Sequence, residues 1–145
     1  MFKTILVPTD GSPLSDKAIN AAIEFAKLSG SKIIGLSVAE PYLYTPLSEG
    51  PMAVDADSYR EKMLSMAQLH AQKIAEAAKE GGVAYETMVK ESFSPYQEII
   101  NVAEEKKCGI IFMASHGRKG LSKLFLGSET QKVLAHSSIP VLVFR

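Results

Sequence analysis

The sequence predicts an α/β fold in which helices cover both faces of a parallel β-sheet. Short, unbroken apolar runs rich in Ile, Val and Phe alternate along the chain with longer segments of helical periodicity. Unbroken apolar runs of this length are typical of strands that are buried on both faces, as in parallel sheets. The regular alternation of strands and helices favours a parallel sheet between two helical layers.

The chain begins with a predicted strand and a predicted helix. Residues 4–7 form the first apolar run. A helix is expected to follow, because Ser12 is a typical N-cap residue and Pro13 would occupy the first helical position. Its apolar residues share one helical face, and Gly30 marks its end.

A second strand and a second helix follow, separated by a long irregular stretch. The strand is predicted at residues 32–38, and the helix runs from about Asp55 to Glu80, just before a pair of glycines. Residues 39–54 between them contain several prolines and a glycine. Loops of this length in compact domains often carry function.

The rest of the chain repeats the alternation. In order, the sequence predicts a weaker strand at residues 85–90, a helix capped by Ser94 from Pro95 to about Lys107, a strand at residues 110–114, a helix from Ser128 to His136, and a strand at residues 141–144.

The composition indicates a single domain over residues 1–145 and excludes several functions. Sixteen Lys and Arg balance sixteen Asp and Glu, so the chain has no overall basic surface and we expect no nucleic-acid partner. The single cysteine, Cys108, excludes an intrachain disulfide and a multi-cysteine metal site. No run of apolar residues is long enough for a membrane span or a signal peptide, so we expect a cytoplasmic protein with no membrane partner.

Two polar, glycine-bearing segments follow predicted strands and are the candidate ligand site. They are residues 8–12 and residues 115–128. In open parallel sheets, ligands bind beyond the carboxyl ends of the strands, where the strand order reverses. If the sheet divides between the first and fourth strands, these two segments face each other across the crevice.

The later segment has the features of a phosphate-binding loop. Gly117 and Gly120 allow the backbone to approach a ligand closely and permit positive φ. Gly127 and Ser128 then open a helix, and the N-terminal amides of a helix favour an anion. Arg118, Lys119 and Lys123 add local positive charge. The segment is neither a P-loop nor a G-x-G-x-x-G motif, and a connecting loop with a helix cap is the structural alternative.

Other residues have both a functional and a structural interpretation. Asp10 offers two acceptors suited to a diol, but it is also a common turn residue before glycine. Ser128 is expected to cap its helix whether or not it binds a ligand. Met63 and Met66 are predicted core residues, and His70 is predicted to lie on a helix far from a second metal ligand.

Four segments resemble the universal stress protein family: ILVPTDGS at residues 5–12, SHGRKG at 115–120, LGS at 126–128 and IPVLV at 139–143. The resemblance extends over the whole chain. In nucleotide-binding members the later segments follow the pattern G-x2-G-x9-G-[ST]. This chain has Ala114 at the first glycine and keeps Gly117, Gly127 and Ser128. A methyl group is tolerated at negative φ, so Ala114 is expected to leave binding weakened or unchanged.

The resemblance implies a flavodoxin-like sheet of strand order 3-2-1-4-5 and an adenine-nucleotide site. Asp10 would contact the ribose, and the strand ends at Pro8 and Val38 would flank the adenine. The phosphates of ATP, ADP or AMP, with Mg²⁺, would lie against the later segment. The full set of implied ligand-binding residues is Pro8, Thr9, Asp10, Val38, Ala114, Ser115, His116, Gly117, Arg118, Lys119, Gly120, Gly127, Ser128, Glu129 and Thr130.

The expected function is that of a stress-response regulatory or sensor protein that binds an adenine nucleotide. We expect that the protein is not an enzyme and that any ATP hydrolysis is slow and incidental. The reason is that no carboxylate accompanies His116 in the sequence to serve phosphoryl transfer. A homodimer through the last strand is expected, since residues 141–144 would form an apolar sheet edge. The alternative is a nucleotide-free dimeric interaction module of the same fold.

Overall fold

The computed structural model of the chain describes residues 2–41, 55–117 and 125–145. It confirms the α/β fold and the strand order, with a five-stranded sheet in the order β3-β2-β1-β4-β5. All neighbouring strands in this sheet are parallel. The elements, in chain order, are β1 (Thr4–Thr9), α1 (Pro13–Ser29), β2 (Lys32–Ala39), α2 (Ala56–Glu80), β3 (Tyr85–Glu91), α3 (Pro95–Glu105), β4 (Ile110–Ala114), α4 (Ser128–His136) and β5 (Val141–Phe144).

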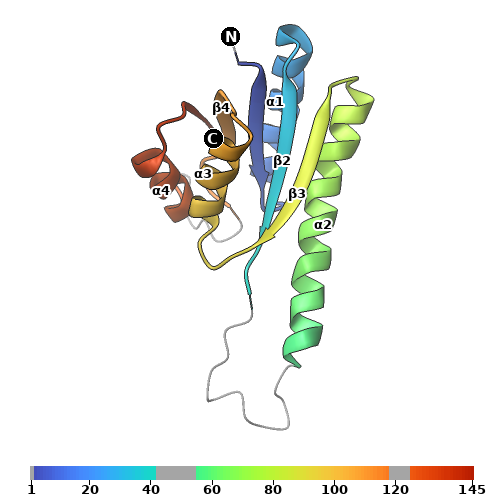
Figure 1. The fold of residues 1–145 in the computed structure, drawn as a ribbon, viewed down its shortest axis with the longest axis vertical. Coiled ribbons are helices and arrows are strands. Elements are labelled where there is room, and N and C mark those ends of the chain that lie inside the picture. The colour runs from blue at the N-terminus through green and yellow to red at the C-terminus, as the bar shows by residue number, and fades with distance from the viewer. Residues whose placement is uncertain (1, 42–54, 118–124) are drawn as a thin grey trace.

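Two helical layers enclose the sheet, as predicted (Figure 1). Alternate residues of β1 point to opposite faces, so Ile5 and Val7 join the core beneath α1 and α2, while Leu6 joins the core beneath α3 and α4. Within the part of the chain that the structure describes, no helix is long and apolar enough to cross a bilayer.

The ends of the helices differ from the predictions in two places. The helix expected to reach Lys107 ends at Glu105, because Lys107 takes a left-handed backbone conformation with φ of 52°. Ser128 was expected to cap α4, but Gly127 occupies the N-cap with φ of −61° and ψ of 151°. The amino end of α4 therefore has no side-chain cap on its own N–H groups.

Helix α2 is anchored to the core only along part of its length. Its buried residues begin near the middle of the helix and continue toward its carboxyl end: Ala67, Ala71, Ile74 and Ala78. The amino-terminal half extends beyond the carboxyl ends of the strands (Figure 1). This half consequently borders the region where the strand order of the sheet predicts a ligand.

Candidate functional site

A cavity of about 480 Å³ lies at the carboxyl ends of β1, β2 and β4, between the two helical layers. Strand β1 pairs with β4 on one side and β2 on the other, so the cavity lies where the strand order reverses. Its volume is within the range of small-molecule sites. The predicted residues that line it are Pro8, Thr9, Asp10, Val38, Ala114, His116, Gly117, Gly127, Ser128, Glu129 and Thr130.

Not every predicted site residue is part of this cavity. Ser115 is buried and is not a lining residue. Its backbone N–H donates to the carbonyl of Phe144, at 2.7 Å, and its own carbonyl accepts from the N–H of Gly127, also at 2.7 Å. Ser115 therefore joins the end of β4 to β5 and to the start of α4. The predicted residues Arg118, Lys119 and Gly120 lie outside the described residues.

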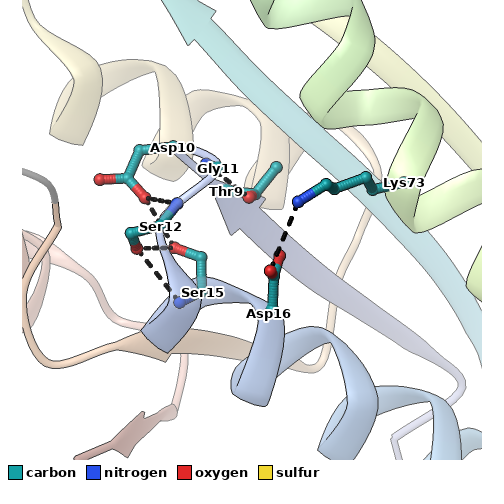
Figure 2. A network of polar contacts seen from close by, with 7 residues as sticks. All are labelled: Thr9, Asp10, Gly11, Ser12, Ser15, Asp16 and Lys73. Carbon is teal, nitrogen blue, oxygen red and sulfur yellow. Dashed lines mark hydrogen bonds and ion pairs between the residues drawn. The ribbon is translucent and has the colours of Figure 1, made fainter.

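Asp10 is held in one orientation by the start of α1 (Figure 2). Its Oδ1 accepts from the backbone N–H of Ser12, at 3.0 Å, and from the hydroxyl of Ser15, at 2.8 Å. Ser15 is buried, so its hydroxyl is fixed beneath the carboxylate. Figure 2 shows the other carboxylate oxygen, Oδ2, turned away from this network. Asp10 therefore makes the predicted turn with one carboxylate oxygen, and its second oxygen points away from that turn.

Gly117 lies directly against that second oxygen. A Cβ atom at position 117 would fall 2.1 Å from Asp10 Oδ2, a distance at which one of the two groups has to move. Gly117 was expected to permit positive φ, but its φ lies outside the left-handed region, so this freedom is not used. Glycine is required here for the close approach of the two loops rather than for an unusual backbone conformation.

The amino end of α4 directs backbone amides at the same cavity. The first N–H bonded inside the helix is that of Gln131, which donates to the carbonyl of Gly127 at 3.0 Å. The N–H groups of Ser128, Glu129 and Thr130 precede this bond, and these residues line the cavity. Such amides, together with the helix dipole, favour an anion.

The side chains of Glu129 and Thr130 have structural partners. The Glu129 carboxylate accepts from the backbone N–H of Tyr96 at 2.8 Å and from Lys132 Nζ at 3.0 Å. The Thr130 hydroxyl donates to the carbonyl of Ala114 at 2.9 Å. These residues are thus placed to meet a ligand with their backbone amides rather than with their side chains. Ala114 ends β4 without positive φ, so its methyl group causes no backbone strain.

Helix α2 provides a wall of the cavity that the sequence analysis missed. Tyr59, Met63, Met66 and His70 all line it. The prediction that both methionines are core residues is wrong, because they are only half-buried and lie near the open end of the sheet. Their spacing of four, three and four residues identifies one helical face, which could have been recognised in the sequence. What the sequence did not reveal is how far α2 extends past the strands.

The charge balance of the cavity is unlike that of a cationic phosphate site. The carboxylates of Asp10, Glu40 and Glu129 line it together with His70 and His116, so carboxylates do accompany His116, contrary to the expectation from sequence. No lysine or arginine is found among the described lining residues. Across the described ranges, no group of His, Cys, Asp and Glu side chains is arranged to hold a metal by itself.

Comparison with known proteins shows the family. The model of the universal stress protein family matches residues 1–145. The chain belongs to this family. Universal stress protein YxiE of Bacillus subtilis is 34% identical, with all of both chains covered. Universal stress protein MJ0531 of Methanocaldococcus jannaschii is 32% identical over all of this chain and 83% of its own.

Solved structures of universal stress proteins share the fold. The structure of MJ0577 from Methanocaldococcus jannaschii has a TM-score of 0.84 and 28% identity, over 99% of this chain and 96% of that one. A universal stress protein in complex with cAMP has a TM-score of 0.72 and 23% identity, over 99% of this chain and 97% of that one. The universal stress protein from Archaeoglobus fulgidus in complex with dAMP has a TM-score of 0.71 and 17% identity, over 98% of this chain and 97% of that one.

Proposed function

We propose that this universal stress protein binds an adenine nucleotide in the cavity and acts as a stress-response regulator or sensor. The observation that carries the proposal is the combination of two different ends within one cavity. At one end, Asp10 Oδ2 lies against Gly117 beside the amides of α4. At the other, Val38 and the methionines of α2 offer apolar surface to a base. Family members in complex with cAMP and dAMP support this class of ligand.

The residues present fit ATP only if its charge is offset. The carboxylate of Asp10, whose Oδ2 packs closely on the Gly117 backbone, suits the hydroxyls of a sugar. The backbone amides at the start of α4 suit the phosphates next to it. The carboxylates in the lining would repel a triphosphate. We therefore propose that Mg²⁺ accompanies ATP, held mainly by phosphate oxygens as is usual for this ion. Arg118 and Lys119 are the proposed protein cations.

The test is calorimetric titration of the purified protein, after any bound nucleotide has been removed and identified by mass. We expect binding of Mg-ATP, weaker binding of ATP in EDTA, and no binding of inorganic triphosphate without the base. Ligand at about 100 times its Kd should raise the free energy of unfolding by about 2.7 kcal/mol. If adenine nucleotides neither bind nor stabilise the protein, the nucleotide-free interaction module becomes the better proposal.

We propose binding without substantial catalysis. The carboxylate of Glu129 is engaged by Tyr96 and Lys132, and one oxygen of Asp10 is engaged by Ser12 and Ser15. These acids have structural roles at the site. An arrangement that holds ground state and transition state equally well gives no acceleration, so ATP turnover should be slow and incidental.

We also propose a homodimer through β5. This strand is at one edge of the sheet, and Leu142 on it is 43% exposed. Helix α4 packs mainly against α3. An apolar sheet edge invites pairing with a second copy across a two-fold axis.

The substitution Leu142→Glu should convert a dimer into a monomer, because it places a charge in the proposed apolar interface. The measurement is the mass by light scattering at micromolar concentration. Leu28→Glu is the matched control, since Leu28 is 91% exposed and lies near the carboxyl end of α1 instead of on β5, and the mass of this variant should stay dimeric. A monomeric parent, or a dimeric Leu142→Glu protein, contradicts this interface.

A further inference from the structure

The α2 wall of the cavity places an imidazole against Gly11, the residue that follows the candidate sugar-binding Asp10. His70 lies in α2 between the buried residues Ala67 and Ala71, where the helix is still anchored to the core. Its side chain is half-buried and lines the cavity. The ring is therefore presented to the cavity from a firmly packed part of the helix.

His70 packs against Gly11, the residue after Asp10. A Cβ atom at Gly11 would fall 2.2 Å from His70 Nε2, 2.4 Å from Cδ2 and 2.8 Å from Cε1. The imidazole thus occupies the space that a side chain at position 11 would need. Gly11 also has φ of 76°, which disfavours any other residue. The tight turn and the missing side chain together bring α2 up to the loop that carries Asp10.

The two groups have complementary hydrogen-bonding abilities. The Asp10 carboxylate is held by Ser12 and Ser15 through Oδ1, and as a carboxylate it only accepts hydrogen bonds. A neutral imidazole both donates and accepts. A ribose has two adjacent hydroxyls, each of which can donate and accept. A carboxylate and an imidazole that line the same cavity can therefore engage both hydroxyls, one each.

We propose that His70 is a ribose-binding residue, and that with Asp10 it makes the cavity select ribonucleotides over deoxyribonucleotides. This inference rests on the proposed nucleotide-binding function and deepens it. The structural alternative is that the ring merely fills the space above Gly11. The two interpretations of His70 differ in one measurable respect. If His70 contacts the ribose, the loss of affinity on changing His70 depends on which hydroxyl the ligand carries; if the ring only fills space, it does not.

The test is a set of titrations with the Mg²⁺ complexes of ATP, 2′-deoxy-ATP and 3′-deoxy-ATP. His70→Phe keeps a ring against Gly11 and removes both nitrogens, whereas His70→Gln keeps a donor and an acceptor. Leu69→Ala is the control, because Leu69 neighbours His70 on α2 but is 62% exposed and not a lining residue. Thermal melting of each variant reports any structural damage separately.

The parent and Leu69→Ala should bind ATP more tightly than either deoxy analogue. Each missing hydroxyl should weaken binding by about 2- to 13-fold, the range for one neutral hydrogen bond. His70→Phe should lose the preference for ligands that carry one of the two hydroxyls and retain the preference for the other hydroxyl. His70→Gln should keep more of the lost preference than His70→Phe does.

Two results would overturn the assignment while leaving the proposed function intact. One is a parent that binds ATP and both deoxy analogues equally. The other is a His70→Phe protein in which all three ligands weaken by the same factor. A parent that binds none of the three overturns the proposed function, and this assignment with it.

Discussion

Gly117→Val should abolish nucleotide binding and leave the protein folded. A Cβ atom at position 117 would lie 2.1 Å from Asp10 Oδ2, so the carboxylate has to leave its position. That movement breaks its bonds to Ser12 and Ser15 and removes the proposed ribose acceptor. Gly117 is exposed and does not have positive φ, so the substitution brings no backbone strain of its own. Gly117→Ala should act in the same direction.

Calorimetric titration with Mg-ATP and thermal melting on the same samples check this prediction. Gly82→Ala is a useful control, because Gly82 has φ of 65° and no atoms near a new Cβ, so its replacement lowers stability through strain alone. The control should bind nucleotide like the parent despite a lower melting temperature. A Gly117→Val protein with the parent's affinity would show that Asp10 is not where the ligand is held.

Gly127→Val should weaken binding and stability together. Gly127 has φ of −61°, so a side chain there causes no backbone strain of its own. It would instead collide with neighbouring backbone atoms. A Cβ atom would fall 2.9 Å from His116 Cα and 3.3 Å from the carbonyl oxygen of Ser115. The chain after β4 would have to separate from the start of α4, which disturbs the bond from Gly127 N–H to Ser115. Crowding of this kind typically costs about 1–3 kcal/mol.

Chemical denaturation measures that loss, and titration with Mg-ATP measures the accompanying loss of affinity. The two glycines are thus expected to differ: a side chain at position 117 displaces the side chain of Asp10, whereas one at position 127 separates two backbone segments and so costs more stability. If Gly127→Val were as stable as the parent, the close approach of α4 to His116 would not be essential to the folded state.

Local sequence patterns predicted the elements well because strands and helices of this fold depend on nearby residues. The N-cap at Ser12 and the left-handed Gly30 both follow from short-range chemistry, and both are present. Ser128 failed as a cap because Gly127 already takes the extended conformation that precedes the helix. Adjacent small residues at a helix start do not reveal which of them is the cap.

The site was less predictable where it depends on contacts between distant segments. The pattern of glycines indicated a loop near a ligand, but the reason for Gly117 is an oxygen of Asp10, more than 100 positions earlier. His70 and the methionines were assigned to the core or set aside, because periodicity shows which helical face is apolar and not what that face meets. The relative lengths of α2 and the strands decide that, and they are set by the folded structure.

The cavity walls differ in how firmly they are tied to the core, and this difference has a thermodynamic consequence. In α2, residues 56–66 include no buried side chain, and the ion pair from Arg60 to Glu91 of β3 is exposed to solvent, where such pairs contribute little. Local unfolding therefore requires less free energy there than in residues 67–80. Where a ligand suppresses this local unfolding, the free energy of ordering is subtracted from its observed affinity. A change on the outer surface of α2 can then tune ligand affinity from a distance, purely through conformational entropy.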